Sequence, residues 1–360
     1  MKITLIVGAR PQFIKVAPVL RKIGKQHEEI LIHTGQHYDY EMSKIFFDEL
    51  TLPKPDYHLG VGSGPHGEQT GKMLKKIEEV LIEERPNLVL VFGDTNTTIA
   101  GALSAAKLHI KIAHVEAGLR SFDRRMPEET NRVLTDHCSD FLFCPTKTAV
   151  ENLKIEGIKK GVYLTGDVMV DALKENIIIA ERKSKILSEL GLKKNGYHLA
   201  TIHRAENTDD FNRLKSVVGA FCEIENLVFS CHPRTEKYLR KYGLWKKLIG
   251  YVNVITPVGY LDMLRLEKNA KKILTDSGGV QKEAYILKVP CITLRENTEW
   301  IETVEDGWNV LVGSDKKTII KMVNEFEPEG RQRNVFGNGN ASEKIAKIIN
   351  NAYDEDTDDA

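Results

Sequence analysis

The sequence lacks the features that mark membrane proteins and disulfide-bonded proteins. Its five cysteines, an odd number with no Cys-x-x-Cys pair, favour a reduced, cytoplasmic protein. No apolar run approaches the ~18 residues that span a bilayer. The start, Met1 to Gly8, has the pattern of a first β-strand rather than of a signal peptide. We therefore expect a cytoplasmic protein with no membrane partner.

An excess of charge of one sign is also missing. The 360 residues include 51 Lys+Arg and 51 Asp+Glu, so the formal net charge is zero. This balance excludes a globally basic nucleic-acid-binding protein, and we expect no nucleic acid partner. The fractions of apolar residues, 41%, and of charged residues, 28%, are typical of a soluble globular protein.

Two cofactor motifs are absent as well. The turn after the first predicted strand has no Gly-x-Gly-x-x-Gly, and the second predicted strand ends at His33-Thr34-Gly35 without an acidic residue for a ribose hydroxyl. We therefore expect no NAD. Cys231-His232 is a candidate pair of metal ligands, but no second Cys/His pair at zinc spacing accompanies it, so we expect no metal.

What the sequence has is a regular alternation of short β-rich segments and amphipathic helical segments. We expect strands at 2–7, 29–33, 88–92, 111–115, 141–143 and 162–164, and again near 197–201, 226–230, 251–255, 272–275 and 290–294. Alternation of this kind is typical of parallel sheets with helices on both faces. The two runs predict an α/β protein with two Rossmann-like, doubly wound domains facing each other across a cleft.

The same alternation predicts the domain boundaries. We expect an N-terminal Rossmann-like domain over 1–167 and a C-terminal Rossmann-like domain over 168–335, which would begin with a long connecting helix at 168–190. A last helix, about 341–353, is expected to pack back on the first domain. Residues 354–360 are expected to form an acidic tail.

Ligands of open parallel sheets bind beyond the carboxyl ends of the strands, so the residues just after each strand are the informative ones. After the first strand, Arg10 and Lys15 would flank the start of a helix, which is a favourable place for a phosphate. The alternative is that both side chains are simply solvated at a helix start.

Carboxylates follow two neighbouring strands. Asp94 comes after the strand 88–92, Glu116 after the strand 111–115, and Glu128 twelve residues later. A carboxylate that ends a buried strand is costly unless it is paired or functional. The alternatives are that Asp94 caps the next helix, that Glu116 pairs with Arg120, and that Glu128 only complements a helix dipole.

The second half carries the strongest local signal, Ser277-Gly278-Gly279, between a strand and a helix. Backbone amides and a hydroxyl at such a place form a phosphate cradle. Glu283 lies four residues after Gly279, on the same helical face, where its carboxylate can accept both hydroxyls of a ribose. His203, at another strand end, is a candidate acid or phosphate contact; the alternative is a buried structural histidine.

Taken together, these motifs resemble the non-hydrolysing UDP-N-acetylglucosamine 2-epimerases over nearly the whole chain. The resemblance rests on Gly8-Ala9-Arg10-Pro11-Gln12 with Lys15, Gly93-Asp94-Thr95, His114–Arg120, Pro127–Arg132, Gly166-Asp167, His203-Arg204 and Asp276–Glu283. It implies the GT-B fold, a cytoplasmic homodimer, and interconversion of UDP-GlcNAc and UDP-ManNAc without NAD or a catalytic metal.

The resemblance also implies roles for single residues. The catalytic set would be Asp94, Glu116, Glu128 and His203, and the UDP-binding set would be Arg10, Lys15, His203, Ser277, Gly278, Gly279 and Glu283. Many relatives bind a second UDP-GlcNAc as an allosteric activator, and the positions similar to theirs are Gln36, His37, Gln69 and His232. Two departures stand out: the loop 121–126 is shorter than the common bacterial version, and Trp300 stands where many bacterial relatives have a ligand-binding Arg.

The chemistry explains why these residue types are needed. Carbon 2 of the sugar has no neighbouring carbonyl to acidify its hydrogen, so the anomeric C–O bond must break first, through an oxocarbenium-like state. Loss of the C2 proton then gives 2-acetamidoglucal and UDP, and UDP re-adds after protonation from the opposite face. The route needs cations and amides on the diphosphate and at least two carboxylates that exchange a proton with C2.

Three other functions remain open at this point. A hydrolysing 2-epimerase would release ManNAc and UDP. A GT-B glycosyltransferase would need one base and an acceptor site, and a non-catalytic UDP-sugar sensor would keep the phosphate cradle while losing carboxylates. The intact Glu-Ala-Gly-Leu-Arg and Pro-Glu-Glu-x-Asn-Arg patterns favour the non-hydrolysing epimerase.

Overall fold

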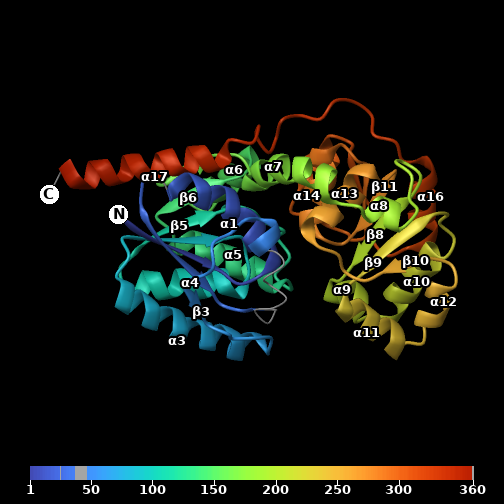
Figure 1. The fold of residues 1–360 in the computed structure, drawn as a ribbon, viewed down its shortest axis with the longest axis horizontal. Helices are drawn as coiled ribbons and strands as arrows, with labels where there is room; N and C mark the ends of the chain where they lie inside the picture. The colour runs from blue at the N-terminus through green and yellow to red at the C-terminus, as the bar shows by residue number, and fades with distance from the viewer. Residues whose placement is uncertain (25, 37–46, 359–360) are drawn as a thin grey trace. The chain divides into compact units, whose positions relative to one another are not determined.

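A computed structural model describes residues 1–24, 26–36 and 47–358, with side chains as far as Tyr353. The chain divides into two compact units, and each is described by itself. The first unit comprises Met1–Glu175 and Asn334–Ala360, and the second comprises Asn176–Arg333. Both units contain a parallel sheet with helices packed on it (Figure 1).

The first unit is built on a seven-stranded sheet in the order β3-β2-β1-β4-β5-β6-β7. Its strands are β1 Lys2–Val7, β2 Glu28–His33, β3 Tyr57–His58, β4 Leu88–Phe92, β5 Lys111–Val115, β6 Phe141–Cys144 and β7 Val162–Leu164. In the register, Leu5 of β1 pairs with Leu31 on one side and Leu90 on the other. All five residues of β4 are buried, because a central parallel strand has helices on both of its faces.

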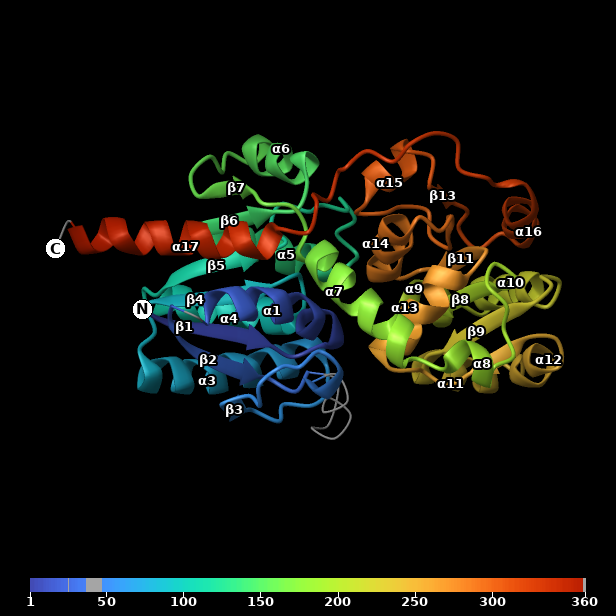
Figure 2. The same cartoon turned by 45° about the horizontal axis from the view of Figure 1, so that its top comes forward.

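The helices of the first unit cover both faces of this sheet. They are α1 Arg10–Ile23, α3 His66–Glu84, α4 Asn96–Lys107, α5 Pro127–Cys138, α6 Lys147–Ile155, the first half of α7 Val168–Lys183, and α17 Ala341–Asp358. On α3, Met73, Ile77 and Leu81 recur at helical spacing and are buried against the strands. Figures 1 and 2 show α3 and α4 on one side of the sheet, and α1 and α17 on the other.

The final helix is tied to the first unit by hydrogen bonds at its start and near its middle. The Asp171 carboxylate accepts from the backbone N–H groups of Ala341 (3.2 Å) and Ser342 (3.0 Å), which caps the start of α17. Near the middle of the helix, the Asn350 side chain lies 2.6 Å from the His27 ring. The helix runs to Asp358, beyond residue 353, where we expected it to end.

The second unit is built on a six-stranded sheet in the order β10-β9-β8-β11-β12-β13. Its strands are β8 His198–Ile202, β9 Leu227–Cys231, β10 Asn253–Ile255, β11 Lys272–Thr275, β12 Cys291–Thr293 and β13 Asn309–Leu311. Its helices are α8 Ile186–Glu189, α9 Ala205–Thr208, α10 Phe211–Phe221, α11 Pro233–Lys241, α12 Trp245–Ile249, α13 Tyr260–Asn269, α14 Gly278–Leu287, α15 Ile301–Glu305 and α16 Lys316–Glu325.

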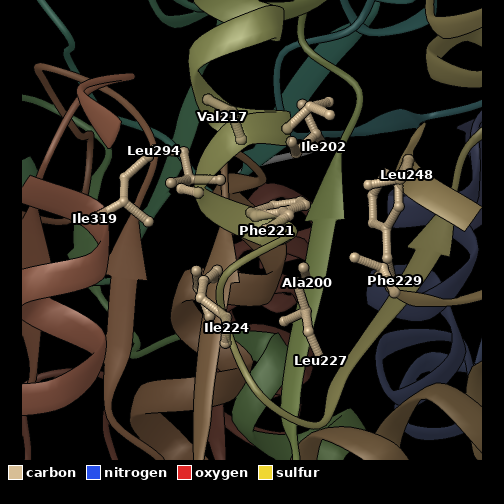
Figure 3. Close-up of a cluster of buried hydrophobic side chains, with 14 of the residues drawn as sticks. Ala200, Ile202, Val217, Phe221, Ile224, Leu227, Phe229, Leu248, Leu294 and Ile319 are labelled. Atoms are coloured by element: carbon tan, nitrogen blue, oxygen red, sulfur yellow. The ribbon is translucent and has the colours of Figure 1, made fainter. Parts of the chain in front are cut away.

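Each face of the second sheet has its own hydrophobic core. On one face, side chains of α10 pack against β8 and β9, and Figure 3 shows Val217 and Phe221 beside Ile202 and Phe229. The rings of Phe221 and Phe229 lie 5.5 Å apart in an edge-to-face arrangement, which is worth roughly 1 kcal/mol beyond the area buried. On the other face, α8, α13 and α14 contribute buried residues such as Met263.

The predicted fold class is confirmed: each unit is a doubly wound, Rossmann-like α/β sheet. Every predicted strand is present. Two short strands were not predicted, β3 Tyr57–His58 and β13 Asn309–Leu311, because two or three residues are too few to show a periodic pattern. The expected helix 168–190 ends at Lys183 and is followed by α8, and the two units divide inside α7 rather than at its start.

In the part of the chain that the structure describes, no helix is long and apolar enough to cross a membrane. The five cysteines are all free thiols. Burial raises the pKa of Cys231 to about 12, so this thiol stays protonated and unreactive at neutral pH.

Candidate active site

Three neighbouring strands of the first unit bring polar residues together at their carboxyl ends. Because β1, β4 and β5 are adjacent in the sheet, the turns that follow them meet. Gly93, just after β4, lies at the meeting point: a Cβ atom at this position would be 3.0 Å from Lys15 Nζ and 3.2 Å from Glu116 Oε2. Gly93 also has a positive φ of 65°, so glycine is required there on both counts.

Lys15 and Glu116 form an ion pair at this point, with Lys15 Nζ donating to Glu116 Oε2. Both residues are buried. The Glu116 backbone has φ 79°, a left-handed conformation that non-glycine residues rarely adopt and that is found most often at functional sites. The sequence had linked Lys15 only with UDP; the structure joins it to a candidate catalytic carboxylate.

Asp94 has a different cation as its partner. The Arg132 side chain forms an ion pair with Asp94 and, 2.9 Å away, with Glu129. The next helix, α4, is capped by the Thr95 hydroxyl, which accepts from the backbone N–H of Thr98. The alternative role of Asp94 as the helix cap is therefore wrong, and its carboxylate is about one-third exposed.

A buried network below these carboxylates fixes the turns that carry them. The His114 ring lies 2.7 Å from the Gly93 carbonyl oxygen through Nε2 and 2.7 Å from Asp136 through Nδ1. Arg120 bonds Asp136 at 2.7 Å and Glu156 at 2.6 Å. These carboxylates take the place of Glu116, the partner considered for Arg120 from the sequence. Burial alone would raise the pKa of Asp136, but the bonds and charges of His114 and Arg120 outweigh it and hold that pKa below its ordinary value.

The two glutamates at the start of α5 have different surroundings. Glu128, the predicted catalytic residue, lies half-buried in the first turn. Glu129 is buried and bonds inward, accepting from the backbone N–H groups of Ser121 and Phe122, both at 2.9 Å. Glu129 and Arg132 were not among the predicted site residues; their i,i+3 spacing on one helix was the available signal.

In the second unit, one buried carboxylate organises two strand ends. Asp276 follows β11 and is fully buried. It accepts from the backbone N–H groups of His203 (3.1 Å) and Arg204 (3.0 Å), and from the Asn207 side chain (3.1 Å). The His203 ring lies 3.3 Å from the same carboxylate, with its side chain 40% exposed. One side of the imidazole thus contacts the buried Asp276 carboxylate, and part of the ring is exposed to solvent.

The predicted phosphate cradle lies at the start of α14. Ser277 is the N-cap residue of this helix, and its hydroxyl makes no capping bond. A Cβ atom on Gly278 would lie 3.3 Å from Trp300 Nε1, 3.7 Å from Glu299 Oε2 and 4.0 Å from Arg204 Nη2, so two donor side chains and one carboxylate lie near this helix start. Glu283 is buried one turn further along.

Trp300 is itself held by a buried cation. Lys282 Nζ lies 4.1 Å from the centre of the Trp300 ring, which is cation–π geometry. Both residues are buried. Arg295, also buried, bonds Glu299 at 3.0 Å.

The sequence of this chain is similar to that of known proteins over almost its whole length. Residues 21–350 match the family described as UDP-N-acetylglucosamine 2-epimerase. A protein of Methanococcus maripaludis described as a UDP-N-acetylglucosamine 2-epimerase homolog is 62% identical, over 98% of this chain and 100% of its own length. The chain belongs to the UDP-N-acetylglucosamine 2-epimerase family.

Two further members of the UDP-N-acetylglucosamine 2-epimerase family are informative. The crystal structure of Methanocaldococcus jannaschii UDP-GlcNAc 2-epimerase in complex with UDP-GlcNAc and UDP matches with a TM-score of 0.92 and 52% identity, covering 97% of this chain and 99% of that one. This match supports the two-domain GT-B fold class. A Pseudomonas aeruginosa protein, UDP-2,3-diacetamido-2,3-dideoxy-D-glucuronate 2-epimerase, is 48% identical over 97% of this chain and 99% of its own length.

Of the four residues that we expected at an activator site of this family, two meet in the first unit. The Gln69 side chain donates to the Gln36 carbonyl oxygen (2.8 Å), and the Gln36 side chain accepts from the Thr97 N–H (3.0 Å). His37 lies outside the described residues. His232 belongs to the second unit, where it caps α11 and its ring lies 5.8 Å from that of His203.

The described residues contain no cluster of candidate metal ligands. In the ranges 1–24, 26–36 and 47–358, no group of three or more His, Cys, Asp or Glu side chains is arranged to hold a metal ion. The charged groups of the first unit's site instead pair with each other, as Lys15–Glu116 and Arg132–Asp94.

Proposed function

We propose that this protein is a non-hydrolysing UDP-N-acetylglucosamine 2-epimerase, which interconverts UDP-GlcNAc and UDP-ManNAc. The observation that carries the proposal is the pair of carboxylates at the ends of adjacent strands, Glu116 and Asp94, each with its own cation, Lys15 and Arg132. A glycosyltransferase needs a single base. Two separately paired carboxylates suit a reaction that removes a proton from one face of a carbon and returns it to the other.

The proposed reaction is an elimination followed by a re-addition. The anomeric C–O bond breaks, its electron pair leaves with UDP, and the C2 proton passes to a carboxylate, which gives 2-acetamidoglucal. The second group, as a carboxylic acid that has taken its proton from water, then protonates C2 from the opposite face, and UDP re-forms the bond at C1. The first group returns its proton to water. No electron is gained or lost overall, so the route requires no NAD, and we expect no catalytic metal.

We assign the two faces of C2 to Glu116 and Asp94. Lys15 would keep Glu116 ionised and ready to accept a proton, because a buried cation favours the charged carboxylate. Asp94 pairs with Arg132 but is about one-third exposed, so it would take up a proton from water before it acts as the acid. Glu128, in the first turn of α5, would be the third carboxylate around the sugar.

The leaving diphosphate needs positive charge and hydrogen-bond donors. We assign this role to Arg10, to Ser277, to the backbone amides of Gly278 and Gly279, and to His203, which Asp276 orients. The backbone N–H groups at the start of a helix favour the binding of a phosphate. Glu283, one turn further along α14, would accept the ribose hydroxyls.

One observation favours a second substrate. The chain is 62% identical to the M. maripaludis protein described as a homolog, but 52% identical to a second protein of that organism described as the UDP-N-acetylglucosamine 2-epimerase. The P. aeruginosa relative, which is 48% identical, is named for a different sugar nucleotide, UDP-2,3-diacetamido-2,3-dideoxy-D-glucuronate. The same elimination applies to both sugars, because both have an acetamido group at C2.

The test is to incubate the purified protein in D2O with each sugar nucleotide and to follow the reaction by NMR. The proposal predicts a C2 epimer with deuterium at C2 and little free sugar. Accumulation of free ManNAc and UDP would identify a hydrolysing enzyme instead. Deuterium incorporation only into the diacetamido uronate would reassign the substrate, and no exchange in either would favour a UDP-sugar sensor or a glycosyltransferase.

Three further expectations belong to this proposal. We expect the protein to be cytoplasmic. We expect it to form a homodimer, which light scattering after size-exclusion chromatography would detect. We also expect UDP-GlcNAc to act as an activator through Gln36, His37, Gln69 and His232. Activation would appear as a sigmoidal dependence of the reverse rate on UDP-ManNAc that becomes hyperbolic when UDP-GlcNAc is added.

A further inference from the structure

The loop between β5 and α5 presents an aromatic side chain in an unfavourable way. Phe122 has φ 58°, in the left-handed region, which costs free energy for a residue with a bulky side chain. Its side chain is 78% exposed, so the ring is also left in water. The first feature is a backbone cost, and residues held in such conformations gather at functional sites.

The strained conformation is nevertheless held in place by specific bonds. The Glu129 carboxylate accepts from the backbone N–H of Phe122 (2.9 Å) and from the N–H (2.9 Å) and hydroxyl (2.8 Å) of Ser121. Further along the loop, Arg125 bonds the Asp123 carboxylate through its backbone N–H and its guanidinium, at 2.8–3.0 Å. The loop is therefore built to keep Phe122 where it is.

The anchor of this loop is also joined to a proposed catalytic carboxylate. Arg132 bonds Glu129 at 2.9 Å and pairs with Asp94 through its other terminal nitrogen. Glu129 and Arg132 are both buried. A single chain of bonds thus runs from Asp94 to the backbone of Phe122, so the backbone at Phe122 is tied to that carboxylate.

We propose that Phe122 is a specificity-determining residue that packs against the sugar of the bound nucleotide sugar, over its C–H face and the methyl of its acetamido group. The inference rests on the proposed function. A phenylalanine side chain has only two torsion angles to fix when it binds, and the area it buries would favour the sugar nucleotide over UDP alone.

The test compares Phe122→Ala with wild type in two ligands, UDP and UDP-GlcNAc. We expect KM and Kd for UDP-GlcNAc to rise about tenfold, as for the loss of a contact of moderate size, while Kd for UDP is unchanged by titration calorimetry. Phe122→Tyr keeps the ring and should behave like wild type. Tyr251 is similarly exposed, at 71%, so Tyr251→Ala is a matched control that should change neither constant.

The outcomes separate this inference from the proposed function. An active wild type whose KM and Kd are unchanged by Phe122→Ala would overturn the inference alone, as would an equal loss of affinity for UDP and for UDP-GlcNAc. A wild type without C2 exchange overturns the proposed function, and the two Kd values then still test the role of the ring. Since the ring is exposed, Phe122→Ala should unfold at the same temperature as wild type; a fall of many degrees would mark a structural role and overturn the inference.

Discussion

Lys15 and Glu116 are 101 positions apart in the sequence and form a buried ion pair at the carboxyl edge of the first sheet. The lysine comes from α1, after β1, and the glutamate from the turn after β5. A buried pair adds little stability as a whole, but the loss of one partner leaves an uncompensated charge in a dry environment. The pair therefore couples the fold of the first unit to the ionisation of a proposed catalytic group.

Replacing Lys15 by Met should destabilise the protein by about 3–5 kcal/mol, because the buried Glu116 carboxylate would lose its cationic partner. Urea denaturation measures the loss. The double variant Lys15→Met with Glu116→Gln should recover most of it, since neither charge then remains. Strictly additive effects in this cycle would show that the two side chains do not interact.

Asp94→Asn and Glu116→Gln should each lower turnover by about 10²–10⁴-fold, as expected for the loss of a general acid or base. Both substitutions keep the shape of the side chain, so Kd for UDP should be unchanged. Deuterium incorporation at C2, measured by NMR, is the direct measurement. Glu236→Gln, in a surface pair with Arg240, is the control, and full activity in either site variant would remove that carboxylate from the mechanism.

His33 should make stability depend on pH. It is fully buried, between the rings of Phe13 and His58, and burial lowers its pKa to about 4 from 6.5. The unfolded chain binds a proton below pH 6.5 and the folded chain does not until about pH 4, so stability present above pH 6.5 is lost as the pH falls. The loss should be about 1.4 kcal/mol per pH unit, and about 3 kcal/mol by pH 4.

The variant His33→Phe tests this account, because its ring can stack in the same place without titrating. Its free energy of unfolding at pH 7 should match or exceed that of wild type, since both ring nitrogens of His33 are buried with no hydrogen-bond partner among the described residues. Between pH 6.5 and pH 4 it should lose less stability than wild type. Parallel pH profiles for the two proteins would contradict the assignment.

Gly278→Ala should weaken the binding of UDP by about ten- to a hundredfold, because the added methyl would sit 3.3 Å from Trp300 Nε1 at the proposed phosphate cradle. Titration calorimetry with UDP measures the change. Gly71, inside α3, has open space around its Cβ position, so Gly71→Ala is a matched control. That variant should be more stable by about 1 kcal/mol and should bind UDP normally.

The sequence pattern predicted the parts of the site that depend on local rules. Strand ends position Asp94, Glu116, His203 and Ser277, and a strand end is visible wherever an apolar run stops. Partners of these residues were less predictable. Arg132 belongs to a motif, but no local pattern indicates that it pairs with Asp94. The position of Lys15 at a helix start predicts a phosphate contact, because a helix start attracts anions.

Hydrophobic periodicity and turn residues by themselves determined the α/β class, the two Rossmann-like units and most strand positions, because those depend on near neighbours along the chain. Only the tertiary structure decided which charges face each other: Lys15 with Glu116, Asp94 with Arg132, Arg120 with Asp136. The first two of these pairs join segments that follow different strands, and their contact depends on sheet order, β1-β4-β5. Sheet order is a global property, since it balances the burial of every helix and strand at once.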